Sequence, residues 1–129
     1  MSGRYLLDTN IVIALFAADE AVTTKLGEAD EIFIPSIVLG ELYYGAERSG
    51  RVEENKQRID EFGEKNVILG CDRETAKKYG DVKNKLRQKG RPIPENDIWI
   101  AALGLQHDVM IVSRDKHFEE VDDLSIVIW

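Results

Sequence analysis

The sequence has little of what stabilises secreted proteins or builds zinc sites. Its 129 residues include one cysteine, Cys71, and two histidines, which exclude an internal disulfide and leave too few ligands for a zinc site of the usual kind. No apolar run approaches the roughly 18 residues that span a bilayer, and the N-terminus lacks the pattern of a signal peptide. We therefore expect a cytoplasmic protein without a membrane segment.

Internal repeats, low-complexity tracts and a polar linker are also missing. The length is that of one domain, and a domain of this size buries about two-thirds of the surface of its unfolded chain. Hydrophobic residues make up 43% and charged residues 32%, which is typical of a globular protein rather than a disordered one. We expect a single domain over residues 1–129.

Positive charge is scarce overall but locally concentrated. The formal net charge is −7, yet residues 73–91 hold eight lysines and arginines against two acids, a net +6 that leaves −13 for the rest. Such a stretch is either a solvated helix face or a surface for nucleic acid or a partner. Both interpretations stay open.

Short apolar runs alternate along the chain with stretches of helical spacing. We predict strands at 4–8, 31–34, 66–69, 109–113 and 125–129, and helices at 10–17, 20–29, 36–48, 51–62, 72–89 and from 96 or 97 to 106. Short apolar strands separated by helices are typical of a parallel sheet covered on both faces. The sequence therefore predicts an α/β fold.

Four carboxylates border or interrupt the apolar segments: Asp8, Glu41, Asp97 and Asp115. Asp8 and Asp115 follow predicted strands, and Asp97 begins an apolar helix. Ligands of open α/β sheets bind at the carboxyl ends of strands, so we expect these ends to converge. Carboxylates gathered without cations repel one another, and their hard oxygens suit a divalent metal. The pattern favours metal-assisted chemistry on a phosphate.

Three of these acids also have ordinary structural explanations. Asp8 suits a helix N-cap, Asp97 a first helical turn and Asp115 a turn. Glu41 differs, because the residues three and four positions away are all uncharged: Ile37, Val38, Tyr44 and Gly45. A surface glutamate usually has a basic residue at these spacings, and burying one without a partner is costly. A functional role is therefore favoured for Glu41.

Four ordered segments that span most of the chain carry a family resemblance: YLLDTNIVIAL, IVLGELYYGA, KGRPIPENDIWIAA and VMIVSRDKHF. The chain resembles the PIN-domain family, in particular the VapC toxins of type II toxin–antitoxin modules. The resemblance implies a PIN-like fold, with a central parallel sheet of about five strands and helices on both faces. It also implies a Mg²⁺- or Mn²⁺-dependent endoribonuclease that cleaves RNA, forms a homodimer and binds a cognate VapB-like antitoxin.

The family's acidic residues correspond to Asp8, Glu41, Asp97 and Asp115, and small polar positions near the site correspond to Thr9, Asn10 and Ser113. We assign Asp8 and Asp97 as direct metal ligands. Glu41 and Asp115 act through water, complete a second metal position or help to deprotonate the nucleophile, and these alternatives stay open. The candidates to hold RNA phosphates beside the acidic cleft are Lys83, Lys85, Arg87, Lys89 and Arg91.

Other functions fit parts of the pattern. A receiver domain would need paired acids after the first strand and a lysine after a late strand, but Asp8 is single and Ser113-Arg114 end the late strand. A PIN nuclease outside a toxin module, acting in RNA processing or on DNA, and a non-catalytic binding module remain as alternatives. No nucleophilic triad is visible, and we expect His107 and His117 to be solvated rather than catalytic.

Overall fold

The structure, a computed structural model, describes residues 3–129, so the first two residues of the predicted domain lie outside the described range. Within that range five parallel strands form one sheet in the order β3-β2-β1-β4-β5. The strands are β1 Arg4–Leu7, β2 Glu31–Pro35, β3 Val67–Leu69, β4 Met110–Val112 and β5 Ile126–Val127. The predicted parallel sheet of about five strands is confirmed.

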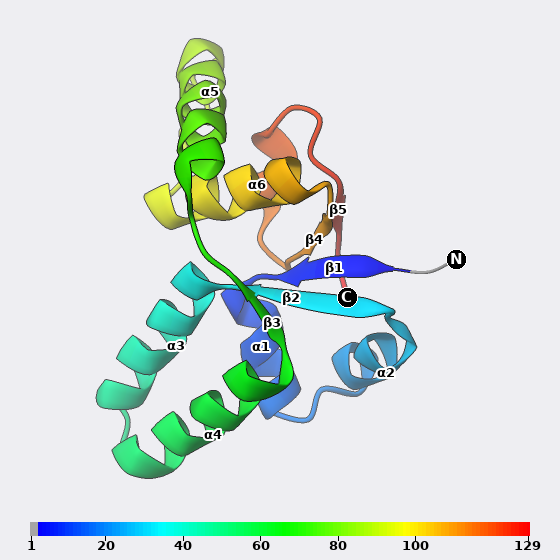
Figure 1. Ribbon diagram of the computed structural model, residues 1–129, viewed down its shortest axis with the longest axis vertical. Helices are drawn as coiled ribbons and strands as arrows, with labels where there is room; N and C mark the ends of the chain where they lie inside the picture. The colour runs from blue at the N-terminus through cyan, green and yellow to red at the C-terminus, as the bar shows by residue number, and fades with distance from the viewer. Residues whose placement is uncertain (1–2) are drawn as a thin grey trace.

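Helices connect successive strands and cover both faces of the sheet (Figure 1). They are α1 Thr9–Phe16, α2 Glu20–Glu28, α3 Ser36–Glu47, α4 Val52–Lys65, α5 Arg73–Lys89, α6 Glu95–His107 and the 3₁₀ helix η1 Lys116–Glu120. In Figure 1, α1 to α4 lie on one side of the sheet and α5 and α6 on the other. The chain crosses the sheet in one direction from β1 to β3 and then returns to β4. Right-handed crossovers therefore place the two groups of helices on opposite faces.

Some boundaries differ from the prediction. The last strand is shorter than 125–129, because β4 has three residues and offers register partners only to Ile126 and Val127. The helix predicted to end at 62 continues through Gly63 to Lys65. A single glycine lowers helix stability by only about 1 kcal/mol and does not have to end it.

The core lies between the sheet and its helices, and it fixes the position of α6. Leu6 and Leu7 of β1 and Ile111 and Val112 of β4 are fully buried. A Cβ atom added to Gly104 of α6 would lie 2.9 Å from Ile111 Cδ1, so α6 approaches β4 more closely than a side chain at that position permits. This close packing holds the first turn of α6 near the carboxyl ends of the central strands. No helix in residues 3–129 is long and apolar enough to cross a membrane.

Candidate active site

Asp8 is the first residue after β1 and the N-cap of α1. Its Oδ1 accepts a hydrogen bond from Thr9 N (2.8 Å), and its Oδ2 accepts one from Ser113 Oγ (2.7 Å). The residue is only 5% exposed. Burial raises the pKa of the Asp8 carboxyl above its ordinary value, and the hydrogen bonds from Ser113 and Thr9 oppose that rise. Asp8 is thus both a helix cap and a buried acid held in one orientation.

The pairing of β1 with β4 explains why Asp8 and Ser113 meet. Leu7 is the register partner of Val112, and Asp8 N donates a hydrogen bond to Val112 O (3.0 Å). β1 and β4 are also the neighbouring strands from which the chain leaves towards opposite faces of the sheet. Ligands of open α/β sheets bind at such a switch point, outside the carboxyl ends of the strands.

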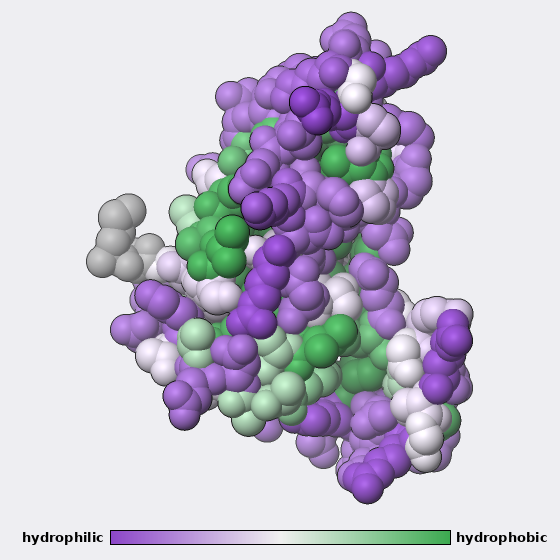
Figure 2. Space-filling model, turned by 180° about the vertical axis from the view of Figure 1, so that it is seen from behind, coloured by the Kyte–Doolittle hydropathy of each residue, from purple (hydrophilic) through white to green (hydrophobic). Residues whose placement is uncertain are grey.

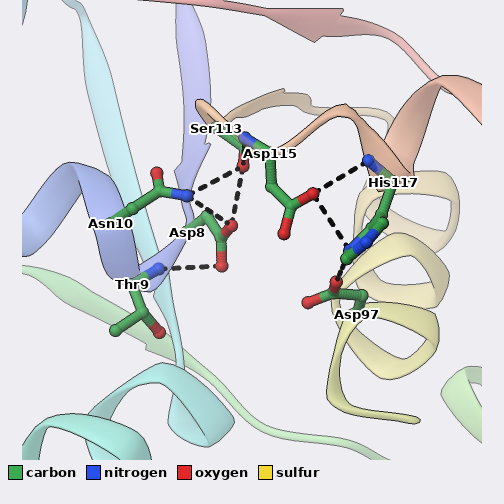
Figure 3. Close-up of polar contacts among 7 residues, drawn as sticks. All are labelled: Asp8, Thr9, Asn10, Asp97, Ser113, Asp115 and His117. Carbon is green, nitrogen blue, oxygen red and sulfur yellow. Dashed lines mark hydrogen bonds and ion pairs between the residues drawn. The ribbon is translucent and has the colours of Figure 1, made fainter. Parts of the chain in front are cut away.

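The first turn of α1 connects Asp8 to the other polar residues. Asn10 Nδ2 lies 3.4 Å from both Asp8 Oδ2 and Ser113 Oγ, and Asn10 Oδ1 accepts a hydrogen bond from Arg114 N (3.1 Å). Thr9 Oγ1 donates to Glu41 Oε1 (3.1 Å). Thr9, Asn10 and Ser113 are therefore the contacts that hold Asp8 and Glu41 in place (Figure 3 shows all of them but Glu41).

Glu41 lies on α3 and is exposed by surface area, although its carboxyl is close enough to other protein atoms to be partly desolvated. Gly40 and Gly45 have nothing within 4 Å of an added Cβ, so the space directly beside these two positions of α3 is open. The partner that sequence spacing could not reveal is Thr9, 32 residues away. Partial burial raises the pKa of Glu41, the bond from Thr9 lowers it, and the charges of Asp8 and Asp97 raise it further.

Asp97, Asp115 and His117 form a second group opposite Asp8 (Figure 3). Asp97 lies in the first turn of α6, and Asp115 caps η1, where its Oδ1 accepts a hydrogen bond from His117 N (3.0 Å). His117 Nδ1 lies 3.1 Å from Asp97 Oδ2 and 2.9 Å from Asp115 Oδ1. His117 was expected to be simply solvated. Its side chain is 47% exposed, but its ring contacts two of the four acids.

The carboxylates repel one another. Burial is the largest cause that raises the pKa of Asp8, Glu41 and Asp97. The charge of Asp8 adds to the rise in the pKa of Glu41 and Asp97, and that of Asp115 adds to the rise for Asp8 and Asp97. Within residues 3–129 no lysine or arginine forms an ion pair with any of the four acids, and the imidazole of His117 is the basic side chain that contacts two of them.

The donor set fits a divalent metal ion. One oxygen each of Asp97 and Asp115 and one nitrogen of His117 lie within 4.8 Å of one another. Carboxylate oxygens are the ligands that Mg²⁺ and Mn²⁺ prefer. A cation bound here would also relieve the repulsion that raises the pKa of Asp8, Glu41 and Asp97.

The basic residues of the predicted RNA-binding set mostly pair with acids other than the four of the cluster. Four of the five candidates form ion pairs with nearby acids: Lys83 with Glu95, Lys85 with Asp81, Lys89 with Asp122 and Arg91 with Glu120. Lys83 pairs with the first residue of α6, two positions before Asp97. The structure brings none of the five into an ion pair with the acidic cluster, so their contact with RNA stays a prediction.

Comparison with known proteins agrees with this architecture. Residues 5–124 match the PIN domain. The chain is 36% identical to ribonuclease VapC2 of Haemophilus influenzae over 129 residues and 30% identical to the tRNA(fMet)-specific endonuclease VapC of Shigella flexneri, with 98% of each chain covered. VapBC2 of Rickettsia felis, solved with a DNA fragment of its promoter, has a TM-score of 0.90 at 29% identity and covers 97% of this chain and 98% of that chain. The chain therefore belongs to the PIN-domain family and, within it, to the VapC ribonucleases.

Proposed function

We propose that this protein is the endoribonuclease toxin of a type II toxin–antitoxin module and that it hydrolyses RNA phosphodiesters with Mg²⁺ or Mn²⁺. Its similarity to VapC ribonucleases supports a metal-dependent nuclease acting on RNA. The observation that supports the site is the approach of four acids from separate elements to the carboxyl ends of β1 and β4. These acids are Asp8, Glu41, Asp97 and Asp115.

Asp8 and Asp97 are the proposed direct ligands of the metal, and Asp115, which has a carboxylate oxygen within 4.8 Å of one of Asp97, contributes to the same site. A bound divalent ion supplies neutralisation of phosphate charge and activation of water. Ser113 and the Thr9 N–H each occupy one oxygen of Asp8 and so fix the direction of its remaining lone pairs. Glu41 is exposed, has a raised pKa and is oriented by Thr9, which suits it to accept a proton from the attacking water. Hydrolysis would then leave a 5′-phosphate and a 3′-hydroxyl.

An apolar groove beside the site supports a protein partner. A cavity of about 300 Å³ between α1, α3 and α4 is bordered by Glu41 and lined by Ile13, Phe16, Leu42 and Ile59. Ile13 is 55% exposed. Figure 2 shows apolar surface on the lower half of the molecule, where α1 to α4 lie. Exposed apolar surface of this kind is typical of interaction sites. We assign this groove to a cognate VapB-like antitoxin, in line with the VapBC2 relative of Rickettsia felis.

The remaining features follow from the same assignment. We propose that the protein acts in the cytoplasm, where RNA and the antitoxin are present, and that it forms a homodimer. A PIN nuclease outside a toxin module is the alternative. A short neighbouring reading frame with a DNA-binding motif would support the toxin assignment, and its absence would favour the alternative.

Cleavage of RNA tests the proposal. Purified, antitoxin-free protein would be incubated with total cellular RNA in Mg²⁺, Mn²⁺ or EDTA, alongside Asp8→Asn, Asp97→Asn and the control Asp30→Asn, an exposed aspartate outside the site. Initiator tRNA is a defined second substrate, because the Shigella flexneri relative is specific for it. We expect discrete metal-dependent fragments with the wild type and the control only. A folded wild-type protein that cleaves no RNA with either metal would overturn the proposal.

A further inference from the structure

One nitrogen atom lies among the oxygens of the candidate site. His117 Nδ1 is 3.1 Å from Asp97 Oδ2 and 2.9 Å from Asp115 Oδ1 (Figure 3). The backbone of η1 fixes this arrangement, since His117 N also donates to Asp115 Oδ1 (3.0 Å). The ring is therefore held against both acids by the N-cap of η1, which is Asp115.

Both contacts are made by the same ring nitrogen, whereas in an ordinary histidine–carboxylate pair one nitrogen contacts one carboxylate. A nitrogen carries at most one hydrogen, so it makes one well-directed hydrogen bond and leaves the second carboxylate poorly satisfied. A neutral ring with its lone pair at Nδ1 would face two acceptor oxygens. With the lone pair at Nδ1, three electron-rich atoms from α6, the segment before η1 and η1 itself therefore face one another.

The spacing of these atoms fits adjacent ligands around a metal as well as it fits hydrogen bonds. Bonds of about 2.1 Å in an octahedral shell put neighbouring ligand atoms about 3 Å apart. The separations of 2.9 and 3.1 Å around Nδ1 match that value. All three candidate ligand atoms also lie within 4.8 Å of one another.

We propose that His117 Nδ1 is a ligand of the metal, together with Asp97 and Asp115, and that it shifts the preference of the site from Mg²⁺ towards transition-metal ions. This inference rests on the proposed function, because it concerns the same metal site. Mg²⁺ prefers oxygen ligands, whereas imidazole favours transition ions, with affinity rising from Mn²⁺ to Co²⁺. Of the two cofactors proposed above, Mn²⁺ is then the better occupant.

The competing interpretation makes the opposite prediction. If His117 is an internal cation that neutralises Asp97 and Asp115 in place of a metal, its removal strengthens metal binding. If it is a ligand, its removal weakens binding, and most for the ion that favours nitrogen. The sign and the order of the effects across metals therefore separate the two roles without any measurement of RNA cleavage.

The experiment is calorimetric titration of the full chain with Mg²⁺, Mn²⁺ and Co²⁺ at about pH 8, where an ordinary histidine is neutral. His117→Ala is compared with wild type, and His107→Ala is the matched control, since His107 ends α6 and forms no hydrogen bond or ion pair with the four acids in the described chain. We expect His117→Ala to weaken Co²⁺ binding about tenfold, Mn²⁺ about threefold and Mg²⁺ less than about twofold. The visible absorption of bound Co²⁺ should also change in this variant, as it would on loss of a nitrogen ligand.

Asp97→Asn makes the two proposals distinguishable. If Asp97→Asn weakens binding of all three ions while His117→Ala changes none, the metal site stands and the role of His117 is wrong. Tighter binding by His117→Ala would likewise overturn that role. If Asp97→Asn also leaves binding unchanged, the proposed metal site itself is wrong. The His117 side chain is half exposed, and circular dichroism would verify that its variant folds.

Discussion

The acidic end of the sheet and the basic helix α5 differ in how their charged side chains are compensated. Near α5, each of four basic residues has an acidic partner, and these pairs lower the pKa of Glu95 and Asp122 through hydrogen bonds from Lys83 and Lys89. At the sheet end, burial and mutual repulsion raise the pKa of Asp8, Glu41 and Asp97.

The difference separates charge that stabilises the fold from charge kept for a ligand. Exposed ion pairs contribute little to the stability of the fold. Carboxylates that are partly buried and unpaired cost stability, and a protein keeps them where something else supplies the positive charge. A cluster of acids without lysine or arginine partners therefore indicates function more strongly than basic residues that mostly have acidic partners.

Exchanging one aspartate in each region should give the largest contrast. Asp8→Asn removes a proposed metal ligand, and we expect RNA cleavage to fall by about 1000-fold or more, about 4 kcal/mol of transition-state stabilisation. Asp122→Asn removes only the exposed partner of Lys89 and should leave the rate within about twofold of wild type. Single-turnover cleavage in Mn²⁺ measures both. Equal effects of the two exchanges would show that the acidic end of the sheet is not the active site.

Ser113→Ala should have the next largest effect. It removes the bond to Asp8 Oδ2 (2.7 Å) and the acceptor of Asp115 N (2.9 Å), so the carboxylates lose orientation without losing charge. Loss of a residue that orients a metal ligand typically lowers activity or metal affinity by about 10- to 100-fold. The control is Ser125→Ala, an exposed serine next to β5. Unchanged cleavage and Mn²⁺ affinity in Ser113→Ala would argue against its positioning role.

The fold class, and the placement of Asp8 and Asp115 after strands, could be predicted from the sequence because strand ends are local features. Apolar runs with an acid at the carboxyl end predicted where Asp8 and Asp115 lie, and the parallel order then placed them together. The sequence could not show what each acid contacts. The bond between Thr9 and Glu41 spans 32 residues and depends on how α1 and α3 pack.

His117 shows the limit of judging a residue by its neighbours in sequence. Charged residues around it favoured solvation, and its side chain is indeed half exposed. Its contacts depend on the 3₁₀ helix η1, which Asp115 caps, and on the close packing of α6 against β4 at Gly104, which together bring Asp97 to the same ring. A single histidine two residues after a site acid, in a chain with only two histidines, was the available signal.

Charge repulsion should also appear as a dependence of stability on pH. Carboxyls with raised folded-state pKa values bind protons more tightly in the folded protein, so their contribution is present below the ordinary pKa values of 3.8 and 4.5 and is lost as pH rises through the raised ones. In EDTA at neutral pH, Asp97→Asn should raise Tm by about 3 °C, roughly the effect of 1 kcal/mol in a domain of this size.

Thermal unfolding followed by circular dichroism measures this effect. The difference in Tm between Asp97→Asn and the wild type should shrink as pH falls towards 4. It should also disappear when Mn²⁺ is added, because the ion then neutralises the carboxylates of the wild type. Asp122→Asn should show the opposite trend, because its lowered pKa contributes stability above the ordinary value that is lost in acid. A wild type that stays as stable as Asp97→Asn in EDTA would show that the acids do not repel one another significantly.

The smallest effects should come from the basic residues of α5, and they test whether those without an acidic partner bind RNA. Arg87 forms no ion pair within the described residues, whereas Lys85 is paired with Asp81 at 3.2 Å. We expect Arg87→Gln to raise the KM for RNA about twofold to threefold and to reduce the salt dependence of binding by about one released ion. Lys85→Gln should change neither and should leave the thermal stability at that of the wild type, because the pair is exposed. KM values at two salt concentrations decide the point, because equal effects of the two variants would mean that local pairing does not determine which charges of α5 reach the substrate.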